Sequence, residues 1–474
     1  MKRFGDHIST RLCLMLSIIT QVACAHSSVA QTGSDKSSGG QAGQSPIAIA
    51  STSGVPAPGK GVLTAEDEQF LDDLQRRGIQ FFIDEADPET GLMPDRGKAN
   101  GGGGDVASIA SVGFGLTALC IGAERGWVPR QDVYDRSIRV LKFLRDKVPH
   151  AHGHFYHFLD MRTGQRVWDS EASNIDTAIL MAGAITVRQL FPNTELASIV
   201  NELYQRVEWG WLVRPDGRLC MGWKPESGFI DAHWDQFNEG TLIFLMAMGS
   251  PTHPLPPEAW QSWERKPVMQ YEGMTFLQCP PLFTQQFPQC WFDLRGLRDD
   301  SVDYFRNSQL ATRAQREWCA NELSKRFPSY SSTLWGISAS DSAVGYQAWG
   351  GPPQQGAIDG SVVPCAVAGS LPFEPRLCMD ALLAMRKQCG DKGYLKYGFV
   401  DAFNPATDWY NPDVIGIDVG ATVVMAENCR SGFVWRKFMS STEAVTALKA
   451  ARFVHVEGDN SATLMTSIFS RAER

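Results

Sequence analysis

The chain has 474 residues, of which 43% are hydrophobic, 20% charged and 10% aromatic. This is the composition of a globular protein with a large core, so it excludes disorder, collagen and coiled coil for the bulk of the chain. The 44 Lys and Arg against 52 Asp and Glu give a formal net charge of −8, which leaves no basic field to attract nucleic acid. The count of 14 Trp is high for this length.

The first residues are typical of a secretory signal. Basic residues in the first eleven positions precede a short apolar run at 12–19, and small residues follow at 23–30. The run is too short to span a bilayer. We therefore expect a signal peptide over 1–30 and an exported bacterial protein that is periplasmic, outer-membrane-associated or secreted. A lipid anchor at Cys24 stays open as an alternative, although Gln21 stands where such a signal prefers an apolar residue.

Composition then divides the rest of the chain. Residues 31–62 are rich in Gly, Ser, Pro, Gln and Ala, which predicts a disordered linker because such residues bury too little apolar surface to fold. We expect one folded domain over 63–454, a C-terminal tail over 455–474 and a monomer. No other run is long and apolar enough to predict a membrane span.

Cysteine and histidine patterns indicate neither a disulfide framework nor a metal site. Nine Cys follow the signal, an odd number without CxxC spacing, and most lie in apolar helical sequence that predicts buried thiols, as at Cys120, Cys365 and Cys429. Residues 150–157 read HAHGHFYH, where Gly153 favours a loop over a helix that would bring two His to one face. We therefore expect no metal and no cofactor, with a metal at this cluster as the lesser alternative.

Two kinds of helix alternate along the domain. One kind is amphipathic, with one wet face, and is predicted at 65–84, 131–147 and 196–208. The other kind is apolar nearly all round and must be buried on all sides; it is predicted at 106–120, 175–190, 240–248, 362–371 and 420–426.

This alternation predicts a repeated helical hairpin. The sequence indicates about twelve helices, starting near 65, 105, 131, 174, 195, 234, 281, 301, 360, 375, 417 and 441. A hairpin that cannot bury its apolar helix alone must close or stack with its neighbours. We expect an all-α fold in which six hairpins close into an (α/α)6 toroid, with short β-hairpins in rim loops near 153–161 and 212–222. An open solenoid is the alternative.

Several buried helices begin with an acidic residue. Asp176, Asp235, Glu239 and Asp418 all lie where such a helix starts. N-terminal capping alone explains part of this pattern. Glu239 differs, because the apolar text GTLIFLMAMG follows it directly. A carboxyl group at the mouth of an apolar helix should have a raised pKa, which suits a general acid near neutral pH.

The tryptophan excess falls in the loops that precede these helices. Trp in polar loops favours an aromatic cleft over surplus core, and indole faces pack on the CH faces of sugar rings. Acids and aromatics on one rim predict a carbohydrate site, and two opposed carboxyls suit glycoside hydrolysis. These loop tryptophans are Trp168, Trp209, Trp211, Trp223, Trp234, Trp335, Trp349 and Trp409.

Three segments resemble a known family. They read SNIDTAILMAGAI from 173, WDQFNEGTLIFLMAMGSPTHPLP from 234, and YGFVDAFNPATDWYNPDVIGIDVGATVVMAENCRSGFVWRKFM from 397. The text is similar to the glycoamylase-like domain of bacterial exported proteins, whose characterised relatives include the β-1,2-glucanases of glycoside hydrolase family 144 and, more distantly, family 162. The resemblance spans about 63–453 and implies an (α/α)6 toroid, no metal requirement and inverting hydrolysis of β-glucan.

The resemblance also assigns residues. Glu239 matches the general acid, and Asp418 or Asp401 the base. Val419 departs from the family pattern IDQG, and MAENCRSG at 425–432 replaces MIENYRTG, so a change in substrate or activity is expected. The predicted substrate-binding residues are Asp169, Glu171, Asp176, Trp223, Trp234, Asp235, Trp349, Phe403, Asn404, Trp409 and Tyr410.

The sequence thus predicts an exported β-glucan hydrolase with β-1,2-glucan as the expected substrate, an oligosaccharide or polysaccharide as its partner and no nucleic acid. Three alternatives remain. A glycosidase or transglycosylase of other linkage specificity fits the same toroid. A non-catalytic cell-surface glycan-binding protein would keep the aromatic rim. A polysaccharide lyase would need a basic cleft, which the net charge of −8 opposes.

Overall fold

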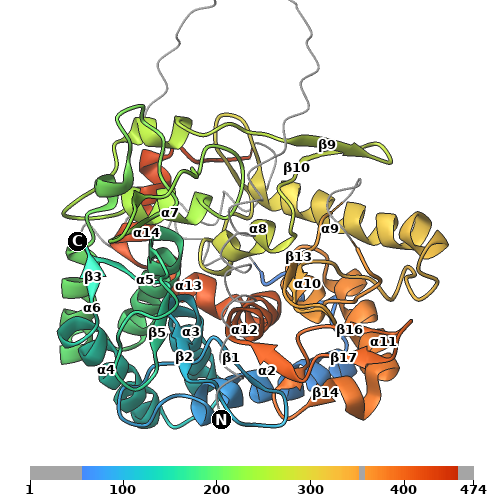
Figure 1. Ribbon diagram of the computed structural model, residues 1–474. Helices are drawn as coiled ribbons and strands as arrows, with labels where there is room; N and C mark the ends of the chain where they lie inside the picture. Colours follow the sequence, from blue (N-terminus) through green and yellow to red (C-terminus); the bar gives the residue numbers. More distant parts are fainter. Residues whose placement is uncertain (1–55, 352–357, 457–474) are drawn as a thin grey trace, which may run out of the picture.

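The buried helices form a closed ring in the computed structural model, which describes residues 56–351 and 358–456 (Figure 1). Neighbours around the ring contact one another from α3 to α5, α5 to α7, α7 to η3, α10 to α12 and α12 back to α3. Gln286 closes the remaining step by donating to the carbonyl of Ala366 at 2.8 Å. The ring consists of α3 (Ile109–Glu124), α5 (Asn174–Leu190), α7 (Thr241–Met248), α8 (Phe283–Gln286) with η3 (Phe287–Cys290), α10 (Pro364–Ala368) and α12 (Gly416–Arg430).

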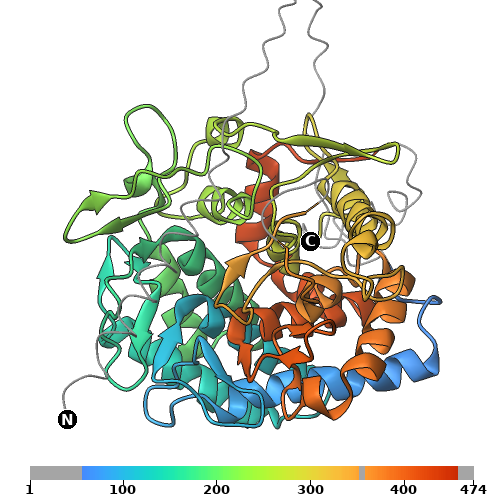
Figure 2. The ribbon, with the colours of Figure 1, turned by 45° about the vertical axis from the view of Figure 1, so that its right-hand side comes forward.

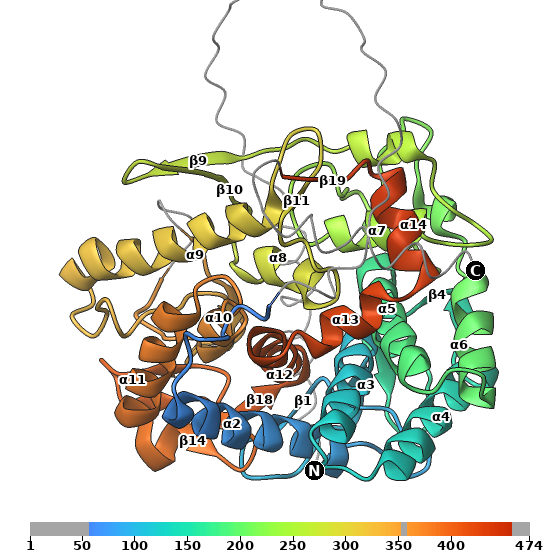
Figure 3. The same ribbon diagram turned by 180° about the vertical axis from the view of Figure 1, so that it is seen from behind.

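A second set of helices surrounds this ring (Figure 3). These helices are amphipathic, as their sequence pattern predicts. In α2, for example, Leu71, Leu74 and Phe82 face inward while charged residues face water. The outer helices are α2 (Ala65–Asp84), α4 (Arg130–Asp146), α6 (Glu195–Gln205), α9 (Tyr304–Asn321), α11 (Pro375–Gly393), α13 (Phe433–Met439) and α14 (Thr442–Ala450). Three further 3₁₀ turns are η1 (Trp209–Leu212), η2 (Pro257–Gln261) and η4 (Leu323–Lys325). The predicted helical toroid is confirmed.

Short antiparallel strand pairs connect the helices, and the longest, β9–β10, extends along the top of the molecule in Figures 1 and 2. The pairs are β1 (Arg96–Lys98) with β18 (Asp413–Ile415), β2 (Val106–Ser108) with β5 (Phe158–Asp160), β3 (His150–Ala151) with β4 (His154–Phe155), β9 (Val268–Tyr271) with β10 (Met274–Leu277), β11 (Leu297–Arg298) with β19 (Val454–His455), β12 (Ala339–Ser340) with β13 (Gln347–Ala348), β14 (Tyr394–Leu395) with β15 (Gly398–Phe399), and β16 (Phe403–Asn404) with β17 (Trp409–Tyr410). The three-stranded sheet joins β6 (Ala172–Ser173), β7 (Gly222–Lys224) and β8 (Gly228–Phe229).

Three helix starts differ from the prediction because strands and loops take their first residues. Helix α3 begins at Ile109, since the preceding residues form β2. Helix α10 begins at Pro364, because the residue before a proline is biased toward extended backbone. Helix α7 begins at Thr241, so that the preceding acidic segment is a loop on the rim. In each case the shift leaves polar residues at the mouth of a buried helix.

Glycines let two inner helices approach at backbone distance. A Cβ atom on Gly183 of α5 would lie 2.0 Å from the carbonyl oxygen of Gly113 in α3, and a Cβ on Gly113 would lie 2.4 Å from that of Ile179. No larger side chain fits such a contact without movement of a helix. The small-residue content of these helices therefore has a direct packing cause.

The ends of the folded part differ slightly from the predicted boundaries. Gly59, placed in the predicted linker, donates its N–H to the carbonyl of Cys429 at 2.8 Å, and Arg295 donates to that of Pro56 at 2.6 Å. His455, placed in the predicted tail, belongs to β19. Backbone hydrogen bonds, which composition does not reveal, hold both segments. The predicted signal peptide and Cys24 lie outside the described residues.

All nine cysteines from Cys120 to Cys429 are buried, as the apolar helical sequence around most of them predicts. Residues 150–157 form the β3–β4 turn rather than a helix, again as predicted. Within the described ranges, none of the helices combines the length and apolarity that crossing a membrane requires.

Candidate active site

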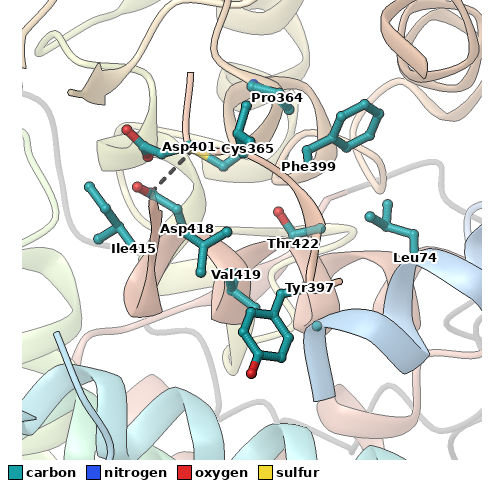
Figure 4. Close-up of a pocket in the computed structure, with 13 residues that line it drawn as sticks. Leu74, Pro364, Cys365, Tyr397, Phe399, Asp401, Ile415, Asp418, Val419 and Thr422 are labelled. Carbon is teal, nitrogen blue, oxygen red and sulfur yellow. Dashed lines mark hydrogen bonds between the residues drawn. The ribbon is translucent and has the colours of Figure 1, made fainter. Parts of the chain in front are cut away.

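A pair of buried carboxyl groups lies at the start of α12. Asp418 stands in the first turn of this helix and is 8% exposed; Asp401, on the loop after β15, is 5% exposed. Oδ1 of Asp418 accepts a hydrogen bond from the thiol of Cys365 at 3.2 Å. Figure 4 shows the two carboxyls and this thiol close together above an apolar cavity. The structure thus brings together the two residues that the sequence left as competing candidates for the base.

Asp401 is held from one side. Its Oδ2 accepts from the backbone N–H of Asp341 at 2.7 Å and from Nδ2 of Asn411 at 3.3 Å. Its Oδ1 is buried without a well-aligned donor among the described residues, yet it lies close enough to Asp418 for the two groups to titrate together. A proton on Asp401 would give Oδ1 a hydrogen bond to the Asp418 carboxylate.

Burial raises the pKa of both groups. For Asp418 the pKa rises to about 6, with hydrogen bonds from Asp401 and Cys365 partly opposing the rise. For Asp401 burial and the negative charges of Asp418 and Asp341 raise the pKa well above the ordinary value. Within the pair, Asp401 therefore holds its proton more tightly than Asp418 does.

Arg96 supports this pair from β1. Its guanidinium contacts Asp341 at 2.8 Å and Asp95 at 3.1 Å, and Asn411 also donates to Asp341 at 3.0 Å. Burial would lower the pKa of Arg96, but the carboxylates outweigh it and raise the pKa. The pairing of β1 with β18 places Arg96 directly opposite Ile415, which begins the segment leading into Asp418.

Glu239 lies on the rim loop immediately before α7. Burial raises its pKa to about 7, and the negative charge of Asp176 adds to the rise. Trp234 anchors this loop: it is 4% exposed, and its Nε1 donates to Oδ1 of Asn174, the first residue of α5, at 2.9 Å. A buried tryptophan thus ties the loop of Glu239 to the helix of Asp176.

Asp176 and Glu171 flank one histidine. Nδ1 of His157 lies 3.1 Å from Oε1 of Glu171, and Nε2 lies 3.4 Å from Oδ1 of Asp176. The Ser173 hydroxyl donates to Oδ2 of Asp176 at 2.5 Å. Asp95 raises the pKa of both His157 and Asp418, so it lies near this group and near the Asp401–Asp418 pair. The acids at the starts of α5 and α12 and in the loop before α7 therefore share one rim of the toroid.

Four predicted substrate contacts belong to the scaffold instead. Trp234, Trp349, Phe403 and Asn404 are at most 5% exposed, which leaves almost no surface for a sugar. Trp349 donates Nε1 to Ser340 Oγ at 3.1 Å, and Asn404 donates Nδ2 to the Asp359 carbonyl at 3.0 Å. Sequence pattern could not distinguish these roles, because both place an aromatic or amide side chain in a polar loop.

The other predicted contacts keep some exposure. Asp169 is exposed, and Asp235 and Trp223 are half-buried. Trp409 and Tyr410 are half-buried on β17, where the Tyr410 ring stacks on the buried Phe403 at 5.8 Å between centroids. Their binding role stays a prediction.

The structure adds residues that no sequence pattern indicated, among them Asp95, Arg96, Asp341 and Asn411. Trp168, one of the loop tryptophans of the sequence, is 39% exposed and sits edge-on to Phe158 at 5.1 Å. Trp168 and Asp169 both have positive φ, at 56° and 49°. Such backbone is uncommon for residues other than glycine and points to a loop whose shape is constrained. Trp168 thus presents an indole beside the histidine group.

The cavity behind the carboxyl pair is apolar. It is lined by Leu74, Phe399 and Val419 among others. Val419, which departs from the family pattern, points away from Asp401 in Figure 4 and packs toward Gly78 of α2. Its side chain therefore faces the core, and its apolar neighbours are the medium that withholds solvation from Asp418.

Comparison with known proteins agrees with this architecture. Residues 231–442 match the family model Glycoamylase, described as "Putative glucoamylase". A curated exo beta-1,2-glucooligosaccharide sophorohydrolase (non-reducing end) of Parabacteroides distasonis is 27% identical over 416 residues, which are 79% of this chain and 56% of that protein. The chain thus spans little more than half the length of this relative.

Two solved structures have the same fold. The endo-beta-1,2-glucanase from Chitinophaga pinensis, in complex with sophorotriose and glucose, aligns with a TM-score of 0.75 and 28% identity over 82% of this chain and 99% of that one. A beta-1,2-glucanase from Parabacteroides distasonis aligns with a TM-score of 0.76 and 26% identity over 82% of this chain and 60% of that one. The comparisons thus agree with the resemblance found in the sequence: the chain is similar to glycoamylase-like domain proteins and has the helical toroid fold of these two bacterial β-1,2-glucanases.

Proposed function

We propose that this protein is a glycoside hydrolase that cleaves β-1,2-glucan by an inverting general acid and base mechanism. The observation that carries the proposal is the pair of carboxyl positions on one rim whose pKa values are raised into the neutral range, about 7 for Glu239 and about 6 for Asp418. Between these values Glu239 still holds its proton while Asp418 has lost one. This is the combination that glycoside hydrolysis requires.

Glu239 is the general acid in this proposal. It protonates the leaving oxygen of the scissile bond, because burial keeps its carboxyl neutral at a pH where an exposed glutamate is ionised. Inversion needs a carboxyl on the opposite side of the sugar ring, roughly 6.5 to 9.5 Å away, with water between.

Asp418 is the base, and Asp401 keeps it ionised. Cys365 and Asp401 both stabilise the ionised form of Asp418 by hydrogen bonding. Asp401 is fixed by Asp341 and Asn411 and keeps its proton, so it is less suited to accept another. Asp418 activates water directly or through a substrate hydroxyl.

The substrate follows from similarity. The relatives with the same fold are named as acting on β-1,2-linked glucans, one as an exo-acting sophorohydrolase and one as an endo-glucanase. Exposed and half-buried aromatic rings near the acids, Trp168, Trp223 and Trp409, supply surfaces on which glucose rings stack.

Three other functions are less well supported. A glycan-binding protein without activity would not need carboxyl groups held at a cost in solvation, and a lyase would need a phenolate or imidazole base. Burial and the negative charges of Asp418 and Asp401 raise the pKa of Tyr346 well above its ordinary value. The Tyr346 phenol therefore stays protonated and cannot serve as the base of a lyase. A different linkage specificity is an outcome of the substrate panel below. We also propose that the protein is exported, because residues 1–30 are typical of a secretory signal. Attachment of a lipid at Cys24 is the alternative form of this export.

The test is release of reducing sugar from linear β-1,2-glucan by the wild type and by Glu239→Gln, beside β-1,3-, β-1,4- and β-1,6-glucans. We expect turnover of β-1,2-glucan by the wild type with inversion at the anomeric carbon. Loss of at least about 100-fold in kcat is expected for the variant, the usual contribution of a general acid. Binding without turnover by the wild type would refute the hydrolase, and equal turnover by both proteins would refute the assignment of Glu239.

A further inference from the structure

His157 lies at the centre of the charged group beside Glu239, and the reaction described above gives it no task. Both of its ring nitrogens face carboxylates, Nδ1 toward Glu171 at 3.1 Å and Nε2 toward Asp176 at 3.4 Å. We propose that His157 is a positioning residue that acts as a fixed imidazolium, clamping these two carboxylates and setting the electrostatic potential at the acid Glu239. This inference rests on the proposed function and deepens it.

The geometry favours the charged form of the ring. A neutral imidazole has one N–H, so it can donate to one of two flanking carboxylates and must turn a lone pair toward the other. Only the imidazolium donates to both. The side chains of His157 and Glu171 are each 15% exposed and that of Asp176 is 7% exposed, so water contributes little to their solvation.

The ring is also fixed mechanically. Phe158 stacks on it at 3.8 Å between centroids with an interplanar angle of 14°. The backbone of His157 donates to the carbonyl of Glu171 at 2.9 Å and accepts from the N–H of Ile109, the first residue of α3, at 3.1 Å. The backbone of His157 is thus tied to α3 and to the segment that leads into α5, and Phe158 packs against the face of its ring.

The charges around the clamp account for its effect. His157 faces Asp176, Glu171 and Asp95; burial would lower its pKa, but these carboxylates raise it to about 9. Burial raises the pKa of Glu171, but the hydrogen bond and the charge of His157, together with the charge of Lys224, lower it overall. Asp176 has a raised pKa from burial, which His157 partly offsets. The negative charge of Asp176 in turn raises the pKa of Glu239, so the charge state of the clamp acts on the acid through Asp176.

A metal ion is the competing explanation for one His with two acids. One ligand atom from each of the three residues lies within 4.8 Å of the others, so an ion and an imidazolium differ in what the ring nitrogens carry. A metal ligand needs a nitrogen without a proton, whereas the imidazolium carries a proton on both. The spectroscopic and metal measurements below separate the two.

Three substitutions separate charge from hydrogen bonding. His157→Gln can keep a donor toward Asp176, and His157→Asn a donor toward Glu171, while both lose the positive charge. Without that charge every deprotonation nearby becomes harder, so the alkaline limb of kcat/KM against pH should rise by up to about one unit. A higher pKa makes Glu239 a weaker acid, so kcat should fall in both variants while KM changes little. Asp176→Asn removes a negative charge and should move the same limb downward.

The opposite directions carry the test. If His157 only supports the fold, the His157 and Asp176 variants lose activity while the alkaline limb of the pH profile stays in place. Wild-type activity in either His157→Gln or His157→Asn would likewise show that a hydrogen bond is enough. Either result overturns the proposal. His152→Asn is the matched control: this histidine lies in the same segment, contacts Glu208 at 3.0 Å with a side chain 47% exposed, and should leave the profile unchanged.

A second measurement needs no turnover. With 9 His in the chain, the His157 imidazole can be assigned in ¹⁵N-histidine spectra of the full protein by comparison with His157→Gln. We expect both ring nitrogens to stay protonated above pH 8, and titration near the ordinary value of about 6.5 would overturn the proposal. If the purified protein contains stoichiometric metal, and if a chelator that removes the metal also changes the His157 signal, the proposal is overturned in favour of a metal site. If no glucan is cleaved, the proposed function fails while this readout still decides the charge of His157.

Discussion

The thiol of Cys365 donates a hydrogen bond to Oδ1 of Asp418 at 3.2 Å, linking the first turn of α10 to the first turn of α12. Burial, with the charges of Asp418 and Asp401, raises the pKa of this thiol well above its ordinary value, so it remains a neutral donor across the working pH range. The base of the proposed reaction is thus oriented by a sulfur atom, and Asp401 supports it from the other side.

Replacing that thiol should move the acidic limb of activity. We expect kcat/KM to rise as Asp418 loses its proton near pH 6 and to fall as Glu239 loses its proton near pH 7. Cys365→Ala removes a donor to the ionised form, so the pKa of Asp418 and the acidic limb should rise by about 0.5 to 1 unit. Cys365→Ser keeps a donor and should leave the limb near its place. A profile identical in all three proteins would contradict this orienting role.

The two members of the carboxyl pair should differ in their substitutions. Asp418→Asn removes the base and should lower kcat by at least about 100-fold. Asp401→Asn keeps an amide that can donate to Asp418, as the protonated carboxyl does, and should cost about tenfold or less. Measuring kcat of both variants at pH 6.5 tests which residue is the base. A larger loss of kcat in Asp401→Asn than in Asp418→Asn would make Asp401 the base.

The acid should be a weak point in stability at high pH. The pKa of Glu239 is raised from 4.5 to about 7 by burial, so its contribution to stability is full below pH 4.5 and is lost as pH rises through 7. Glu239→Gln has no such loss and should be about 1–3 kcal/mol more stable than the wild type at pH 8, with no difference at pH 4. Thermal unfolding at both values measures this. A difference of the same size at pH 4 would point to packing rather than charge.

Trp168 should contribute to binding without supporting the core. Its ring is 39% exposed and contacts Phe158 by its edge, so a sugar can lie on the remaining surface. Trp168→Ala should raise KM for β-1,2-glucan about fivefold, equal to about 1 kcal/mol of stacking, with little change in the unfolding temperature. Trp168→Phe should recover part of the loss. Trp127→Ala is the control, because that tryptophan follows the opposite end of α3 and stacks on Arg76 at 4.6 Å.

The contact between Gly113 and Gly183 should tolerate no added methyl group. Gly183→Ala places a Cβ 2.0 Å from a backbone oxygen of α3, so the helices must separate, at a cost of about 1–3 kcal/mol in the free energy of unfolding. Gly210→Ala is the matched control, since its Cβ would meet only Leu255 at 3.9 Å. Equal stability of the two variants in urea would show that α3 and α5 adjust without strain.

Some of these roles could be read from single segments. Glu239 stands directly before an apolar helix, which predicts both its place at the mouth of a buried helix and its raised pKa. The alternation of wet and apolar helices likewise predicts the closed ring. Trp349 and Phe403 show the limit: the same loop composition fits a sugar platform or a buried anchor, and only their exposed fractions of 5% and 0% assign them to the scaffold.

Periodicity and local position along single segments were enough to predict the helical toroid, its resemblance to glycoamylase-like domains and the acids at the starts of its inner helices. How those acids differ depends on residues that are distant in the chain. Asp401 and Asp418 influence each other because the fold buries them together near Asp341, and the proposed charge of His157 arises because Glu171 and Asp176 face its two nitrogens. Burial and charges from residues distant in the chain set the protonation of these groups, and a single segment of sequence reveals neither.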